Sequence, residues 1–384
     1  MKIAITARTA FTPLESIDHA LIIVEDGYIV SAGPRDAAAI PSGARSVDLG
    51  DSILAPGFID IHIHGGAGHD VMAADADGLA RFERSLTKCG VTSYCPTTVT
   101  APLDATCASL EWLAKSKSVP GNGTRARPIG VHLEGPFISH AKRGVHPPEH
   151  LLEPSPELFN RLWDAADGNV AVMTIAPELP GAIETIKAAA EKRVCVSLGH
   201  SNATLAETVA GISAGGRHST HTFNAMRALD HREPGVLGEV LANDQVTSDI
   251  IADGIHVHPE MVSLFVRAKG LDRAVLITDA MSATGMGDGK FRLGHFDVVV
   301  KGDRAEANGV LAGSVLTLDR AVRNVGKFAS LKLQDSVRLA TLNPARVLGH
   351  QDMGIIAPGA RADFAVLSAD GAVEQTIIGG EIGP

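Results

Sequence analysis

Short apolar runs alternate with amphipathic stretches along most of the chain after Pro56. The apolar runs have the length of buried strands and lie near residues 58–64, 91–97, 129–134, 170–176, 194–200, 217–223, 247–253 and 274–279. Helical spacing of apolar residues fills several of the intervals, at 75–88, 155–166, 181–193 and 204–214. Eight strands separated by helices predict an α/β fold, and eight parallel strands close a (β/α)8 barrel of the TIM type. An open, doubly wound sheet is the alternative, although it would normally stop at fewer strands.

The two ends of the chain have a different pattern, which predicts strands. Apolar runs at 20–24 and 28–30 flank Glu25-Asp26-Gly27, and Asp-Gly between apolar runs is typical of a β-hairpin. After the eighth barrel strand we expect a β-like insertion at 290–305, helices at 316–329 and 335–342, and strands at 362–368 and 373–378. These patterns predict a small β domain made of residues 1–55 and 355–384, and a barrel domain at 56–354.

Composition and charge exclude several classes of protein. Of the 384 residues, 45% are hydrophobic and 20% are charged, which is ordinary for a globular chain. The formal net charge is −10 and no long basic run is present, which argues against nucleic acid as a partner. The N-terminus lacks a signal-peptide layout, no apolar run approaches a membrane span, and the four cysteines form no C-x-x-C motif. A cytoplasmic protein without a membrane partner is therefore expected.

Candidate chemistry begins at the first barrel strand, which reads Phe58-Ile59-Asp60-Ile61-His62-Ile63-His64. Alternate residues of a strand project to the same face, so His62 and His64 point together. Gly65 and Gly66 follow directly and leave open space beside the two rings. Two imidazoles facing such a gap suit a divalent metal, and the alternative is a pair that only hydrogen-bonds within the core.

Further imidazoles and carboxylates follow other predicted strands, at the ends that form the active face of such a barrel. Glu134 follows the third strand, His200 the fifth, His221 the sixth and Asp279 the eighth. Imidazole and carboxylate without thiolate suit zinc, iron or manganese in a catalytic site. His132 is either a further ligand or a support for one, and His218 is expected in the core or behind the ligands.

Several motifs resemble known enzymes. Pro56-Gly57-Phe58-Ile59-Asp60-Ile61-His62-Ile63-His64-Gly65 resembles the opening signature of the amidohydrolase superfamily. Within that superfamily the chain resembles the N-acetylglucosamine-6-phosphate deacetylase family. The motifs that carry this resemblance are, in order, His132-Leu133-Glu134-Gly135-Pro136, Gly199-His200-Ser201, His221-Thr222-Phe223-Asn224-Ala225-Met226, Glu233-Pro234-Gly235, Asp253-Gly254-Ile255-His256, Thr278-Asp279-Ala280-Met281, Leu311-Ala312-Gly313-Ser314 and Asn343-Pro344-Ala345.

The resemblance implies a metal-dependent hydrolase that releases acetate from N-acetyl-D-glucosamine 6-phosphate and leaves D-glucosamine 6-phosphate. By similarity, Glu134, His200 and His221 hold the principal metal, and Asp279 is the catalytic acid/base. His62 and His64 match a pair that binds a second metal in some members, so one or two ions are expected. Zinc is the first choice for the ion and iron(II) the second. A homodimer with phosphate contacts near its interface is also implied.

The residues that resemble substrate contacts are Val145, His146, Asn224, Ala225, Arg232, Asp253, Gly254, Ile255, His256, Leu311, Ala312 and Gly313. His146 is expected to donate a hydrogen bond to the developing oxyanion. Arg232 is the candidate for the phosphate, because a guanidinium matches phosphate oxygens in a two-pronged way, and the alternative is a surface-loop arginine. Two other functions stay open: an amidohydrolase for another N-acetyl amino sugar phosphate, and a non-catalytic sugar-phosphate sensor.

Overall fold

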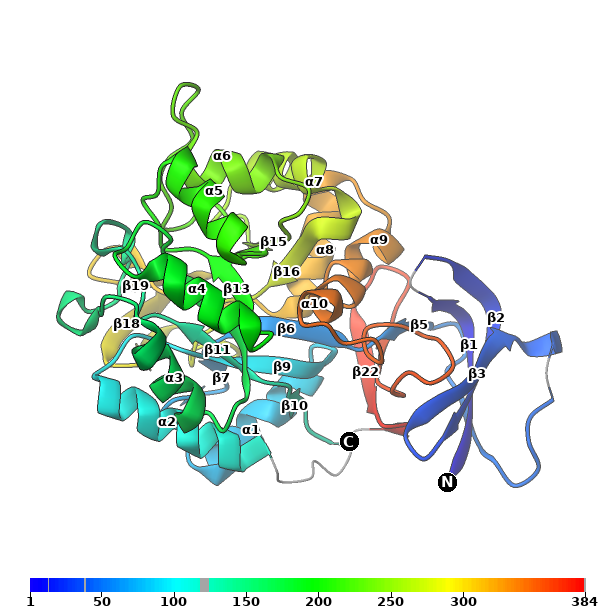
Figure 1. Ribbon diagram of the computed structural model, residues 1–384. Helices are drawn as coiled ribbons and strands as arrows, with labels where there is room; N and C mark the ends of the chain where they lie inside the picture. The colour runs from blue at the N-terminus through cyan, green and yellow to red at the C-terminus, as the bar shows by residue number, and fades with distance from the viewer. Residues whose placement is uncertain (13, 38, 118–123, 383–384) are drawn as a thin grey trace.

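A computed structural model describes residues 1–12, 14–37, 39–117 and 124–382. Within these residues eight parallel strands form a barrel (Figure 1), as the sequence predicted. In chain order they are β6 (Phe58–Ile63), β9 (Val91–Thr98), β11 (Val131–Glu134), β12 (Val170–Ile175), β13 (Cys195–Leu198), β14 (His218–Ser219), β15 (Ser248–Ile251) and β16 (Ala274–Ile277). Each predicted strand is therefore present, although several are shorter than expected.

Backbone hydrogen bonds close the barrel where the sheets are interrupted. The barrel strands β6, β9, β11, β12, β13 and β14 belong to one parallel sheet, and β15 pairs with β16. The N–H of Thr222 donates to the carbonyl of Asp249 (2.9 Å), which joins the end of β14 to β15. The N–H of Asp279 donates to the carbonyl of His62 (2.9 Å), which joins the end of β16 to β6. The first and last strands are thus neighbours, and their polar ends lie side by side.

Helices cover the outside of the barrel (Figure 1). They are α1 (Ala76–Thr87), α2 (Leu103–Lys117), α3 (Pro156–Ala165), α4 (Ala182–Glu191), α5 (Leu205–Ala214), α6 (Gly235–Ala242), α7 (Pro259–Arg273) and α8 (Leu318–Ala329). Side chains at their first residues explain where several begin. Ser155 accepts a hydrogen bond from the N–H of Leu158, and Thr204 forms a reciprocal capping box with Glu207.

The prediction of one helix at 335–342 is wrong. The structure has two short helices there, α9 (Leu333–Arg338) and α10 (Leu342–Val347). Thr341 lies between them with φ −130° and ψ −85°, outside the helical region. Pro344 explains the break, because proline lacks an N–H and is tolerated only in the first turn of a helix. A new helix therefore starts just before it.

Strands from both ends of the chain form one sheet beside the barrel, shown in blue and red in Figure 1. The amino-terminal strands are β1 (Lys2–Phe11), β2 (Ser16–Glu25), β3 (Tyr28–Pro34), β4 (Arg45–Asp48) and β5 (Ile53–Pro56), and the carboxy-terminal ones are β21 (Phe364–Leu367), β22 (Val373–Ile378) and β23 (Glu381–Ile382). β21 pairs antiparallel with β5, which runs directly into β6. A small β domain made from both ends is confirmed, whereas the boundaries 1–55, 56–354 and 355–384 stay a prediction.

The expected insertion after the eighth strand is a four-stranded antiparallel sheet, β17 (Gly289–Leu293), β18 (Phe296–Lys301), β19 (Arg304–Ala307) and β20 (Val310–Leu311). Its buried side chains, including Leu293, Val298 and Val300, pack with Val99 and Met281 at the ends of β9 and β16. The insertion therefore stands over the face where the barrel strands end. No helix among the described residues is long and apolar enough to cross a bilayer.

Candidate active site

Six side chains from five barrel strands meet at the carboxyl ends of those strands. His62 and His64 come from β6 and its end, Glu134 closes β11, and the others follow β13, β14 and β16 as His200, His221 and Asp279. All six are buried, and none has more than 8% of its surface exposed. The parallel barrel thus gathers residues that are separated by more than two hundred positions in the chain.

Three of these side chains form the first group. Oε1 of Glu134 lies 3.2 Å from Nε2 of His200 and 3.0 Å from Nε2 of His221. The two imidazole nitrogens are themselves only 3.0 Å apart. Three donor atoms of this kind, packed so closely, are the arrangement that a divalent cation requires.

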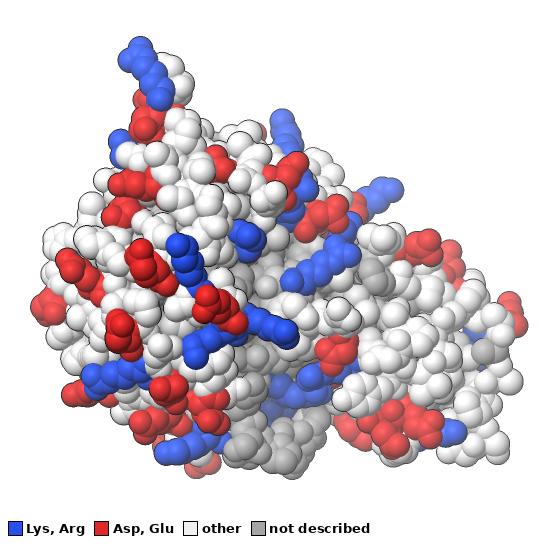
Figure 2. Space-filling view, in the orientation of Figure 1, with Lys and Arg blue, Asp and Glu red and all other residues white. Residues whose placement is uncertain are grey.

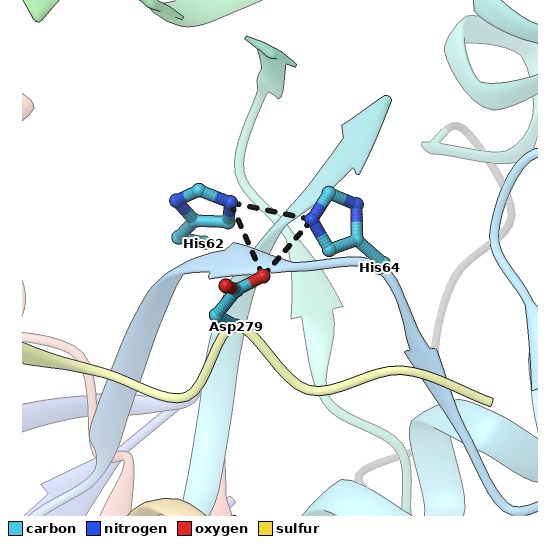
Figure 3. A group of neighbouring side chains, drawn as sticks. All are labelled: His62, His64 and Asp279. Atoms are coloured by element: carbon cyan, nitrogen blue, oxygen red, sulfur yellow. Dashed lines mark hydrogen bonds and ion pairs between the residues drawn. The ribbon is translucent and has the colours of Figure 1, made fainter. Parts of the chain in front are cut away.

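The second group is His62, His64 and Asp279, whose side chains converge in Figure 3. Nε2 of His64 lies 3.1 Å from Oδ1 of Asp279 and 3.3 Å from Nε2 of His62. Glu134 stands between the two groups, because its carboxylate oxygens lie 3.4 Å from Nε2 of His62 and 3.3 Å from Nε2 of His64. A single carboxylate is therefore within reach of cations in either position.

Hydrogen bonds on the far side of two rings fix the form that a metal ligand needs. Nδ1 of His200 lies 2.8 Å from the carbonyl of Lys142, and Nδ1 of His64 lies 3.1 Å from the carbonyl of Thr97. Since a carbonyl only accepts, both Nδ1 atoms carry hydrogen, and each Nε2 points into the cluster, where its lone pair can bind a metal once Nε2 is deprotonated. The donor set of imidazoles and carboxylates without thiolate fits zinc or iron(II).

The cluster shifts the pKa values of its members in opposite directions. Burial opposes the charge of Glu134, but His62 and the hydrogen bond from His146 outweigh it and hold the pKa of this carboxyl well below its usual range. Burial likewise opposes the charge of Asp279, yet His62 and His64 lower its pKa to about 2. Both carboxylates are therefore negative at neutral pH, and the cluster attracts positive charge.

Three of the six residues have a backbone conformation that side chains rarely adopt. φ is 48° at His200, 28° at His221 and 50° at Asp279. Such conformations cost on the order of 1–3 kcal/mol each and persist only where the surroundings hold them. Here the strands end abruptly, and the turn that follows directs each side chain into the barrel mouth.

A cavity of about 320 Å³ opens beside the cluster. Twelve of the predicted site residues line it: His64, Glu134, Val145, His146, His200, His221, Asn224, Ala225, His256, Asp279, Leu311 and Gly313. Nδ1 of His146 accepts a hydrogen bond from the N–H of Thr100 (3.3 Å), so Nε2 of this ring carries the hydrogen. That Nε2 lies 3.5 Å from Oε2 of Glu134, which places an N–H donor beside the cluster.

Other predicted contacts lie outside the cavity wall. Asp253 accepts hydrogen bonds from the N–H groups of Ile255 and His256, and its Oδ2 lies 2.6 Å from Nδ1 of His256. Asp253, Gly254 and Ile255 thus form the turn that supports His256. Ala312 is buried between two lining residues, and its N–H donates to the carbonyl of Ala305.

Arg232 is not brought to the cavity of its own chain. It is exposed, on the segment that projects from the barrel between α5 and α6 in Figure 1. Figure 2 shows basic surface extending into solvent at the tip of this projection. The N–H of Arg232 donates to Oδ1 of Asp230. Arg232 is therefore not among the residues that line the cavity.

Six further residues of the lining were not predicted from the sequence: Val99, Ala141, Lys142, Gly144, Leu293 and Val310. Ala141 to Gly144 follow β11, and their place after a barrel strand was an available signal. Leu293 and Val310 belong to the insertion, and nothing in their sequence pattern indicated a place in the site.

The sequence left open whether His132 is a further ligand or a support for one. Its Nδ1 lies 3.0 Å from the carbonyl of Ile61 and its Nε2 lies 2.8 Å from Oγ1 of Thr174, so both nitrogens are used within the barrel. His132 therefore supports the cluster from below and is not part of it.

The comparisons with known proteins agree with this geometry. Residues 53–383 match the model of the amidohydrolase family. The N-acetylgalactosamine-6-phosphate deacetylase of Escherichia coli O157:H7 is 37% identical over 98% of this chain and 98% of that protein. The N-acetylglucosamine-6-phosphate deacetylase of Vibrio furnissii is also 37% identical, over 94% of this chain and 90% of its own length.

A solved structure gives the same result. The N-acetyl-D-glucosamine-6-phosphate deacetylase of Mycobacterium smegmatis, as a mutant in complex with N-acetyl-D-glucosamine-6-phosphate, is 36% identical and superimposes with a TM-score of 0.92. The match covers 99% of each chain. The resemblance inferred from the sequence motifs is thus confirmed, and the chain belongs to the amidohydrolase family.

Proposed function

We propose that the protein hydrolyses the acetamide of N-acetyl-D-glucosamine 6-phosphate, giving D-glucosamine 6-phosphate and acetate. The observation that carries this proposal is the convergence of Glu134, His200, His221 and Asp279 on one edge of a cavity, in a chain that belongs to the amidohydrolase family. Full-length relatives at 37% identity and a solved structure bound to N-acetyl-D-glucosamine-6-phosphate support this substrate class.

Glu134, His200 and His221 would hold the principal divalent cation, and His62 and His64 a second one where two are bound. When bound, such a cation polarises the amide carbonyl and lowers the pKa of a bound water molecule to about 7. We favour zinc, with iron(II) as the second candidate, because the donors are imidazoles and carboxylates. Glu134 is the residue within reach of both positions.

Asp279 moves the proton in this scheme. It is ionised at neutral pH, lies at the edge of the cavity and is the most exposed of the six, at 8%. It takes a proton from the attacking water and then gives it to the departing sugar nitrogen, which leaves as a neutral amine. Nε2–H of His146 donates to the carbonyl oxygen as negative charge develops there.

Phosphate recognition calls for cations at the cavity, and Lys142 is a basic side chain of this chain that lines it. Arg232 matches phosphate chemically but lies on a projecting, exposed segment. We therefore propose a homodimer in which Arg232 of one chain reaches the cavity of its partner. The cytoplasmic location predicted from the sequence stays a prediction.

The purified protein loaded with zinc is expected to release acetate from N-acetyl-D-glucosamine 6-phosphate, and removal of the metal by a chelator should abolish the reaction. The measurement is kcat/KM for this sugar beside N-acetyl-D-galactosamine 6-phosphate. A higher value for the galactosamine form would favour an enzyme for that sugar, as in the Escherichia coli relative. Tight binding of either sugar without acetate release would favour a sensor.

Asp279→Asn should lower kcat by about 10²- to 10⁴-fold, because the amide cannot accept and return the proton. KM and metal content should change little, so both are measured on the same preparation. Asp319→Asn is the matched control, since Asp319 pairs with Arg323 on the outer helix α8. Near-normal kcat in a fully metallated Asp279→Asn protein would show that another residue is the acid/base.

Zinc binding should release protons in a pH-dependent way. Burial lowers the pKa of His64, but Asp279 and Glu134 outweigh burial and raise this pKa to about 10. Burial also lowers the pKa of His221, and there Glu134 outweighs it and raises the pKa to about 9. Both rings are thus protonated at pH 7 without metal, and binding should release up to about two protons there. Release should decline as the pH rises through 9 and 10. Calorimetric titrations in buffers of different ionisation enthalpy measure it, and no release at pH 7 would contradict this charge distribution.

Arg232→Ala should raise KM for the phosphorylated sugar by about 10- to 100-fold, as expected for the loss of hydrogen bonds to a charged group. KM for N-acetylglucosamine itself should hardly change, and Arg161→Ala, on the exposed face of α3, is the control. Co-expression of Arg232→Ala with Asp279→Asn chains should restore activity, because one site of the mixed dimer receives both residues. Failure to restore it would mean that Arg232 acts within its own chain or not at all.

A further inference from the structure

We propose that the buried pair of Asp249 and His218 is a positioning device for His221, and that it sets the affinity of the site for its cation. This inference rests on the proposed role of His221 as a metal ligand. Asp249 lies on β15 and His218 on β14, with 1% and 0% of their surfaces exposed. Neither residue lines the cavity, so neither touches the substrate.

His221, like His62, lacks the support that the other two rings of the cluster have. In His200 and His64 the second ring nitrogen donates to a backbone carbonyl, which fixes the orientation of the ring. In His221 the corresponding Nδ1 is buried without a hydrogen-bond partner among the described residues. The orientation of this ring therefore depends on how its backbone is held.

Asp249 holds that backbone. The N–H of His221 donates to Oδ1 of Asp249 in a short hydrogen bond, and the N–H of Thr222 donates to the carbonyl of Asp249 (2.9 Å). The residue needs such a hold, because φ at His221 is 28°, in the region that L-residues avoid. Asp249, on the neighbouring strand β15, thus accepts hydrogen bonds from both N–H groups of the turn that carries His221.

His218 in turn fixes the Asp249 carboxylate. Its Nε2 lies 2.9 Å from Oδ2 of Asp249, and its Nδ1 lies 2.7 Å from Oγ1 of Thr247. A carboxylate only accepts, so Nε2 of His218 is the donor to Asp249, while Nδ1 forms its hydrogen bond with the Thr247 hydroxyl. Each side chain in this series of hydrogen bonds has a partner, so the Asp249 carboxylate is held in its orientation toward His221.

This arrangement does more than fill space. Replacing a buried ion pair by apolar residues of similar volume is often neutral or stabilising, so packing alone does not require a His–Asp pair here. What an apolar pair cannot supply is an acceptor for the N–H of His221. Without it the strained turn relaxes, and Nε2 of His221 leaves its place 3.0 Å from both Glu134 and His200.

The test separates the hydrogen bond from packing by measuring zinc affinity of the metal-free protein in competition with a chromogenic chelator. The variants are Asp249→Ala, Asp249→Asn and the double replacement Asp249→Leu with His218→Phe, which keeps the volume of the pair. Ser248→Ala is the matched control, because Ser248 is also fully buried on β15 and its hydroxyl has no hydrogen-bond partner among the described residues. Thermal unfolding of each metal-free protein reports packing independently.

Asp249→Ala and the double variant should lose about 10- to 100-fold in zinc affinity, as do other residues that support metal ligands. Asp249→Asn should stay within about threefold of the parent, because its amide oxygen still accepts from His221 and its NH2 can donate to His218. The double variant should unfold near the parental temperature. If Asp249→Ala does not fold, the double variant alone tests the inference. After cobalt substitution, Asp249→Ala and the double variant should show an absorption spectrum that differs from that of the parent.

The result that overturns the inference is parental zinc affinity in a folded double variant, since the pair would then serve packing only. His221→Ala distinguishes this failure from failure of the proposed function. Loss of zinc affinity in His221→Ala together with parental affinity in the double variant would reject only the positioning role. Parental affinity in His221→Ala itself would reject the metal site on which the inference rests.

Discussion

Two carboxylates, Glu134 and Asp279, are buried among four imidazoles at the mouth of the barrel, and the rest of the site depends on how their charge is balanced. Moving a carboxylate out of water is tolerable only when opposite charge or hydrogen bonds compensate for the lost hydration. Here the compensation comes from rings that can bind either a proton or a cation. The same electrostatic demand therefore favours a divalent metal and keeps Asp279 ionised, so the features needed to bind the metal and to accept a proton have one physical origin.

The barrel makes this concentration of charge possible because parallel strands bring all their carboxyl ends to one face. The strands themselves stop short, and the ligands sit on strained turns at His200, His221 and Asp279. Strain of this kind persists only with support from neighbouring elements. That support is local and specific: the N–H of Asp279 donates to the carbonyl of His62, and its own carbonyl accepts from Ser314. Rigid strands thus hold a site whose immediate backbone is unfavourable by itself.

Much of the fold could be predicted because buried parallel strands leave a strong signal of short apolar runs, and the capping residues Ser155 and Thr204 mark helix starts. The six cluster residues could be named for the same reason, since each follows a predicted strand. The position of Arg232 could not be predicted from the sequence. Its chemistry suggested a phosphate contact, but where a long loop projects is decided by packing, not by the residues within the loop. The insertion residues Leu293 and Val310 were missed because apolar residues at a cavity wall look like ordinary strand residues in sequence.

The site divides into two layers with different freedom to change. The cluster side chains lie on strand ends and are held by buried partners, such as Asp60, which accepts hydrogen bonds from the N–H of His62 and the hydroxyl of Thr278. The cavity wall is instead built from the segment after β11, the turn around His256 and the insertion. A substitution in the wall therefore changes the shape of the cavity, whereas one beneath the cluster changes how the cluster side chains are held. Two relatives that are each 37% identical to this chain carry the names of two different amino sugars. Because the wall and the cluster lie on different elements, the wall can vary in shape while the strand ends keep the same cluster residues.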